Sequence, residues 1–340
     1  MTAVSPLLPS QFWSLSIGVY LFLGGLAGGA YVTGAVADFL SVRDPSRREG
    51  YLATARWGTV LGVLALAIGG PILLFHLGEP LHVLMFWLFT NFDSWMTIGI
   101  WVIVLFMVFS ILQALWLGFG ADRGFSIPGD ALSSVTELID TVADVTRPSE
   151  SVRRGLNAVG ALVGALLIVY TALLLSASSE VVPMWDATWL PPLFLASGLS
   201  MGIAAAVGVT TLTKGVTDTG VTMFSIADDV IIVAEMVVIY LLLATLVNGG
   251  PTAVETQQYL LTEGSVIFWG GVVAAGLLLP LAISASLLAL EWRYDLHENP
   301  RLERLATAGY TAKFGFVIFG GLMLRLTIIY AALNVPLFGV

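Results

Sequence analysis

The sequence predicts an all-α integral membrane protein with about eight transmembrane helices in two four-helix bundles and with both termini outside. Of its 340 residues, 57% are hydrophobic and only 11% are charged, whereas soluble domains carry roughly 25% charged residues. The mean hydropathy is +0.92. A third observation, the placement of the basic residues, predicts the number of helices and their orientation.

Eight stretches meet the length of a spanning helix, which is about 20 mostly apolar residues. The first is interpreted as a retained helix, because neither a basic region nor a small-residue cleavage site marks a signal peptide before Gln11. In order, the stretches are 11–37, 57–76, 94–118, 155–177, 190–212, 225–247, 264–290 and 314–334.

The basic residues favour an even number of helices, because Lys and Arg are retained on the cytoplasmic side of short loops. Thirteen of the 14 follow the first, third, fifth or seventh helix, and the alternate segments contain none. The exception, Arg325, lies inside the eighth helix. Both termini are therefore expected outside. The thirteen are Arg43, Arg47, Arg48, Arg56, Arg123, Arg147, Arg153, Arg154, Lys214, Arg293, Arg301, Arg304 and Lys313.

A weak internal echo suggests that the chain divides into two halves, 1–178 and 179–340. Residues 25–29 read Gly-Leu-Ala-Gly-Gly, and residues 198–202 read Gly-Leu-Ser-Met-Gly. Both segments enter from the outside, as in two parallel repeats, although glycine patterns also recur without a repeat. The polar segment 119–154 has apolar residues at helical spacing, which predicts an amphipathic helix at the cytoplasmic membrane surface.

The rare residues limit the chemistry of the chain. It has no cysteine and only three histidines, so thiolate ligation of iron–sulfur clusters or zinc is excluded. A membrane haem needs two facing imidazoles, and only His76 lies near a helix end. We therefore expect no haem, no iron–sulfur cluster, no metal site and no catalytic centre in this chain. Its surroundings are membrane lipid, and no nucleic acid is expected.

Five segments, in order along nearly the whole chain, resemble the NrfD and polysulfide-reductase membrane subunit family. The first helix reads Tyr-Leu-Phe-Leu-Gly-Gly-Leu-Ala-Gly-Gly-Ala-Tyr at residues 20–31. A His-Leu-Gly-Glu-Pro turn follows the second helix at 76–80, where the family commonly has Arg in place of Glu79. The remaining segments are the start of the third helix at 94–101, the passage from 170 to 194, and Gly-Gly-Leu-Met-Leu-Arg at 320–325.

The resemblance implies a membrane anchor and quinone-binding electron-transfer subunit without cofactors of its own. Such a subunit binds menaquinone or ubiquinone near the outer face of a prokaryotic cytoplasmic membrane. It exchanges electrons with an iron–sulfur subunit at that face, and through it with a molybdenum or multihaem catalytic subunit.

The resemblance also places a quinone-contacting tyrosine at Tyr170, in the N-terminal bundle. A quinone head group has two carbonyls that become hydroxyls, so its pocket needs a few polar groups within an apolar cleft. An aromatic-belt role for Tyr170, helix-end solvation for Gln11 and loop bracing for His76 are the structural alternatives. The other candidates near the outer face are Gln11, Ser14, Tyr20, His76, Trp185 and Asp186.

Glu235 and Arg325 lie near the middle of their helices, where a lone charge costs about 2.5 to 3.5 kcal/mol. The sixth and eighth helices run in the same direction, which predicts similar depths and a buried ion pair. Asp228 and Asp229, at the inner end of the sixth helix, would extend this pair into a proton path toward the cytoplasm. A structural ion pair and solvated aspartates are the alternatives.

Three function classes follow, of which the third, a structural anchor, predicts no dependence on quinone. The first is quinone-linked electron transfer, with or without proton movement. The second is an ion-coupled secondary transporter with Glu235 and Arg325 at a midplane site, which would more often show helices broken by Gly or Pro.

Overall fold

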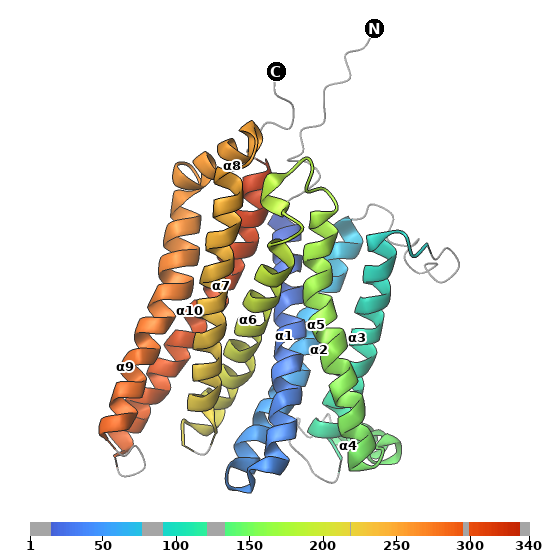
Figure 1. Ribbon diagram of the computed structural model, residues 1–340. Helices are drawn as coiled ribbons and strands as arrows, with labels where there is room; N and C mark the ends of the chain where they lie inside the picture. The colour runs from blue at the N-terminus through green and yellow to red at the C-terminus, as the bar shows by residue number, and fades with distance from the viewer. Residues whose placement is uncertain (1–14, 77–90, 121–132, 218, 295–298, 334–340) are drawn as a thin grey trace.

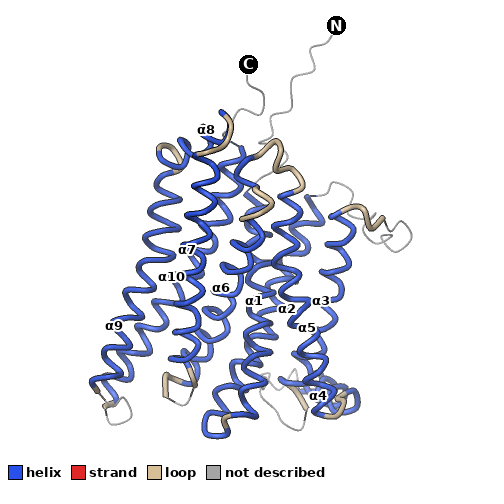
Figure 2. The backbone as a smooth tube through the Cα atoms, viewed as in Figure 1, coloured by secondary structure: helices blue, strands red, loops and turns tan. Residues whose placement is uncertain are grey.

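The computed structural model describes residues 15–76, 91–120, 133–217, 219–294 and 299–333, and these residues form helices and short connections without a strand (Figure 2). Eight helical segments in the described part are long and apolar enough to cross a membrane. The all-α membrane fold predicted from the sequence is therefore confirmed.

The eight spans follow one another along the chain. The seventh begins as a π-helical segment, η6, and continues as α9. The spans are α1 (Leu15–Arg43), α2 (Arg48–His76), α3 (Trp95–Gly118), α5 (Glu150–Ser176), α6 (Leu190–Lys214), α7 (Val221–Val247), η6 (Val266–Leu278) with α9 (Leu279–Arg293), and α10 (Pro300–Leu333). Two 3₁₀ turns, η2 (Pro45–Arg47) and η5 (Pro183–Trp185), precede α2 and α6.

Two spans begin well before their apolar stretches. Helix α2 starts at Arg48 instead of residue 57, and α10 starts at Pro300 instead of residue 314. Their first turns carry polar residues, so a criterion based on apolar length misses them. Lys313, which was predicted in a cytoplasmic loop, lies inside α10 with its side chain fully buried. That prediction is wrong.

Two shorter helices flank the spans. Helix α4 (Ser133–Thr146) is the helix expected within the polar segment 119–154. Helix α8 (Pro251–Leu261) lies between α7 and η6, where the sequence indicated only a polar connection. Its turns are mostly polar, so hydropathy gave no sign of it.

The spans run roughly side by side (Figure 1). The start of α1, the end of α10 and helix α8 lie at one end of the bundle. Helix α4, the α1–α2 connection, the ends of α6 and α9 and the starts of α7 and α10 lie at the other. The basic residues at the helix termini gather at the α4 end. The assignment of this end to the cytoplasm, with both termini outside, remains a prediction.

Helix α1 is central and packs against α2, α5, α6 and α10. A Cβ atom added at Gly29 would overlap the backbone of Gly198, and one added at Gly202 would overlap the backbone of Gly29. These glycines therefore let α1 and α6 approach closely. The two segments that echo each other in sequence meet at this crossing, although the division into two four-helix halves stays a prediction.

Candidate functional site

Two of the predicted quinone residues, Tyr20 and Tyr170, lie close together. They come from α1 and α5, and both are almost completely buried. Their hydroxyl groups are near enough to interact electrostatically. The Tyr20 hydroxyl has no hydrogen-bond partner among the described residues. This arrangement leaves a buried polar group next to a second tyrosine, near the end of the bundle where α1 begins.

Helix α3 approaches the ring of Tyr170 through a glycine. A Cβ atom added at Gly99 would overlap this ring and its hydroxyl group. The apolar residues Leu66, Phe106 and Leu167 pack in the same cluster as Tyr170. Residues of α1, α2 and α3 thus surround Tyr170. The absence of a side chain at Gly99 lets α3 approach the tyrosine ring.

Trp185 and Asp186 make structural contacts in the connection before α6. The indole Nε1 of Trp185 donates to the carbonyl oxygen of Ile328 in α10 at 3.1 Å. One carboxylate oxygen of Asp186 accepts from the backbone N–H groups of Thr188 and Trp189, both at 2.9 Å. Asp186 therefore stabilises the turn that leads into α6.

Three other candidates lie wholly or partly outside the described residues. Gln11 and Ser14 lie outside the described residues. His76 is the last residue of α2, but its side chain lies outside the described part of the structure. Their predicted roles at the quinone site therefore stay predictions.

Arg325 of α10 is fully buried. Its guanidinium carbon stands 4.0 Å from the centroid of the Phe194 ring, and Nη2 donates to the Phe194 carbonyl oxygen at 3.3 Å. Nη2 also lies 3.2 Å from the position that a Cβ atom on Gly25 would occupy. A glycine in α1 thus makes room for an arginine of α10.

Glu235 is buried in α7, but no ion pair joins it to Arg325 in the described part of the chain: Nε and Nη1 of Arg325 have no hydrogen-bond partner there. The two charges do interact electrostatically, and Glu235 also has a hydrogen bond from the Ser197 side chain. The direct ion pair expected from helix depth is therefore wrong, because Phe194 faces the guanidinium.

A cavity of about 10 Å³ adjoins the Glu235 side chain, which is about the space that one water molecule needs. Ser197 and Ser200 of α6 line it, together with Gly276 of η6 and Gly320 of α10. Water in this cavity would connect Glu235 with Ser200.

Asp228 and Asp229 belong to a buried network with Lys313. The ammonium nitrogen of Lys313 lies 2.7 Å from Asp229 Oδ1 and 3.3 Å from Asp228 Oδ2. Asp228 also accepts from the Ser200 hydroxyl at 2.5 Å, and Asp229 accepts from Ser284 at 2.5 Å. Asp228 is fully buried, so it is not one of the solvated aspartates that the alternative interpretation assumed.

The Lys313 network and Glu235 both lie where α7 packs against α6. Asp228 and Glu235 are seven residues apart on α7, or about two turns and 10 Å, while their partners Ser200 and Ser197 lie one turn apart on α6. Two pairs of an acid and a serine therefore lie between Lys313 and Arg325.

Sequence reasoning missed the partners of these acids. Lys313 was assigned to a loop, and the serines drew no attention because single serines are common in membrane helices. It also missed a buried ion pair near the α4 end, where Arg153 donates to both oxygens of Asp38 at 2.8 and 2.9 Å. The sequence signal for Lys313 and Asp38 was a charged residue at a position that still belongs to a membrane-spanning helix.

Comparison with known families adds the deciding observation. A family profile described as "Polysulphide reductase, NrfD" matches residues 5–336, which is nearly the whole chain. The chain belongs to the NrfD polysulphide reductase family. The resemblance indicated by the five sequence segments is thereby confirmed.

Individual members of the NrfD family show the same relationship. The C subunit of the polysulfide reductase of Wolinella succinogenes is 31% identical over 280 residues, which cover 81% of this chain and 83% of that protein. Protein NrfD homolog of Haemophilus influenzae is 31% identical over 281 residues, which cover 80% and 83%. Protein NrfD of Escherichia coli is 29% identical over 197 residues, which cover 58% and 59%. This NrfD-family chain is a multi-pass membrane protein.

Proposed function

We propose that this chain is the membrane anchor and quinone-binding electron-transfer subunit of a respiratory oxidoreductase complex in a prokaryotic cytoplasmic membrane. It exchanges electrons with an iron–sulfur subunit at the outer face, and through it with a molybdenum or multihaem catalytic subunit. The observation that carries the proposal is the family match over residues 5–336. The name of the Wolinella relative, which is one lettered subunit of a reductase, supports a role within a multi-subunit complex.

The tyrosine pair fits the head group of menaquinone or ubiquinone. A buried hydroxyl without a partner costs about 1 to 3 kcal/mol, and the Tyr20 hydroxyl is such a group. A quinone carbonyl oxygen accepts hydrogen bonds, so it would satisfy this donor while the ring packs against apolar side chains. Tyr170 beside it supplies a second donor for the same head group.

Reduction of a quinone takes up two electrons and two protons, and this chain offers residues for the protons. The Lys313 network connects through Asp228 and Ser200 toward Glu235, with space for about one water molecule between them. Arg325 then borders Gly25 of α1, only five residues after Tyr20. We include proton movement along this line in the proposal.

The transporter alternative receives less support. Each span of the described residues is a continuous helix, whereas transporter sites are typically built from interrupted helices. Transport of a solute by the isolated chain in liposomes, without quinone, would favour the alternative.

Gentle solubilisation from native membranes tests the assembly part of the proposal. An iron–sulfur protein and extractable quinone are expected to purify with the chain. A chain that purifies alone and without quinone from intact membranes would contradict it.

The substitution Tyr170→Phe tests the site. Removing this neutral donor leaves the quinone oxygen unpaired at a cost of about 1 to 3 kcal/mol, so quinol turnover should fall about fivefold or more, with little change in thermal stability. Tyr240→Phe is the matched control, since Tyr240 is 70% exposed on α7. Turnover that is unchanged by Tyr170→Phe would remove this tyrosine from the site.

A further inference from the structure

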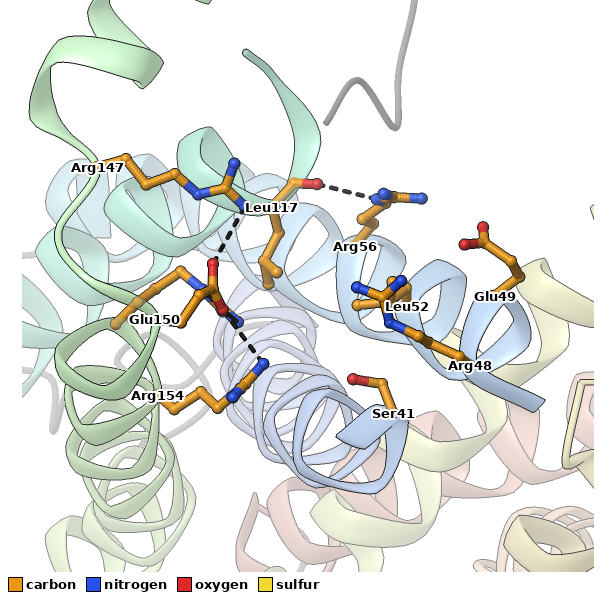
Figure 3. Close-up of a pocket in the computed structure, with 10 residues that line it drawn as sticks. Ser41, Arg48, Glu49, Leu52, Arg56, Leu117, Arg147, Glu150 and Arg154 are labelled. Carbon is orange, nitrogen blue, oxygen red and sulfur yellow. Dashed lines mark hydrogen bonds and ion pairs between the residues drawn. The ribbon is translucent and has the colours of Figure 1, made fainter. Parts of the chain in front are cut away.

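A large polar pocket opens at the α4 end of the N-terminal half, far along α1 and α5 from the tyrosine pair. Its volume is about 540 Å³, within the range of about 300 to 1,000 Å³ that small-molecule sites span. Figure 3 shows side chains from α1, α2, α3 and α5 around it. Its lining residues are Ser41, Arg48, Glu49, Leu52, Arg56, Leu117, Arg147, Glu150, Arg153 and Arg154.

The pocket has an excess of positive charge. Five arginines face two glutamates in its lining, and Asp38 adds a further carboxylate behind it, where it pairs with Arg153 at 2.8 Å. Together these groups therefore carry two more positive than negative charges. Arg153 is buried, whereas Arg48 is exposed and Arg154 is partly exposed to solvent. An excess of cations at such a surface attracts anions.

One carboxylate already serves several of the arginines. Glu150 lies 3.6 Å from Arg147, 3.0 Å from Arg153 and 3.2 Å from Arg154, and Figure 3 shows Arg147 and Arg154 pointing toward it from two sides. Because three arginines share one carboxylate, not every N–H donor has an acceptor. Nε of Arg154 is buried and has no hydrogen-bond partner in the described part of the chain.

The donors come from rigid elements on both sides of the pocket. Arg48 and Arg56 stand two turns apart on α2, and Nε of Arg56 is fixed on the Leu117 carbonyl oxygen at 2.9 Å. Arg154 stands opposite on α5 (Figure 3). Guanidinium groups bind phosphate oxygens through two parallel hydrogen bonds and prefer them to a point-like anion.

We propose that this pocket binds a phosphate-bearing anion, held between Arg48 and Arg154 on opposite walls. The phosphate belongs either to the head group of an anionic phospholipid at the membrane surface or to a soluble phosphate compound. Basic pockets between membrane helices on the cytoplasmic side have this chemistry. The site is separate from the tyrosine pair and does not depend on the electron-transfer function.

The test uses the full-length protein, purified in detergent without phosphate. Binding of phosphatidylglycerol, phosphatidylcholine and inorganic phosphate is measured by native mass spectrometry and by the shift of the melting temperature. We expect phosphatidylglycerol or phosphate, but not phosphatidylcholine, to bind and to raise the melting temperature. Competition by phosphate against phosphatidylglycerol identifies a soluble ligand, and its failure to compete identifies the lipid.

The double substitution Arg48→Gln with Arg154→Gln should weaken this binding at least about tenfold, since two charged hydrogen-bond donors to the anion are lost. Arg301→Gln with Arg304→Gln is the matched control, because both residues are exposed at the start of α10 and the charge loss is equal. Equal weakening by both pairs would overturn the proposal. So would equal binding of both lipids by the unchanged protein without any effect of phosphate, a result that does not depend on the variants folding.

Discussion

The two halves of the bundle bury different kinds of polar group. In the N-terminal half, the deep polar side chains near the start of α1 are the neutral hydroxyls of Tyr20 and Tyr170, and the charged pair Asp38–Arg153 lies toward the α4 end. The C-terminal half buries a line of charges, from Lys313 and its aspartates to Glu235.

Under the proposed function, this difference would separate two tasks within one all-helical fold. The neutral hydroxyls of Tyr20 and Tyr170 suit a neutral quinone, whereas buried acids that pair with serines suit the movement of protons. The boundary between the tasks is the crossing of α1 with α6 and α10, where Gly25 and Gly29 allow close contact. The predictions below test each side and the boundary.

The largest effect is expected for Lys313→Met. The substitution leaves Asp228 and Asp229 in the interior without their cation, which should destabilise the protein by about 3 to 5 kcal/mol. Unfolding in detergent measures this loss. Lys214→Met, which removes an exposed lysine at the end of α6, should have little effect. Adding Asp229→Asn to Lys313→Met should restore part of the stability; equal stability of Lys313→Met and the unchanged protein would show that the network is not charged.

The next effect is expected for Gly29→Ala, at the boundary between the halves. The added Cβ overlaps the backbone of Gly198, which cannot move aside as a side chain can. A cost of about 3 kcal/mol is expected from such overpacking. Gly315→Ala, in open space on α10, is the control. If both variants melt at the same temperature, the close crossing of α1 and α6 is wrong.

A smaller loss is expected for Gly99→Ala in the neutral half. The methyl group overlaps the ring of Tyr170, which must turn away at a cost of about 1 to 2 kcal/mol. Quinol turnover should fall with it, because the hydroxyl is displaced. Gly70→Ala, with no atom within 4 Å of the added carbon, should change neither quantity. Unchanged turnover in Gly99→Ala would separate the α3 contact from the quinone site.

The smallest change in stability is expected for Glu235→Gln, because the amide keeps the shape of the side chain, can still accept the hydrogen bond from Ser197, and breaks no direct ion pair with Arg325. We expect a change below about 1 kcal/mol. Proton uptake linked to quinone reduction should slow about tenfold or more in liposomes, since glutamine cannot relay a proton. Glu255→Gln, at an exposed position of α8, is the control. Normal proton uptake in Glu235→Gln would exclude this residue from the path.

The sequence by itself determined the class of protein and the existence of all eight spans, because burial in lipid requires continuous apolar helices. It also singled out Tyr20 and Tyr170, which the fold brings together, and the acids of α7. The polar starts of α2 and α10 escaped the same criterion, because a helix continues beyond the membrane wherever its backbone hydrogen bonds continue.

Only the tertiary structure decided which of these side chains meet. Helix depth alone paired Glu235 with Arg325, but the packing of α6 places Phe194 against the guanidinium and Ser197 beside the carboxylate. Lys313 became the partner of Asp229 for the same reason. Hydropathy gives the position of a residue along its helix, whereas the glycine contacts between helices set their rotation, and the rotation determines the partner.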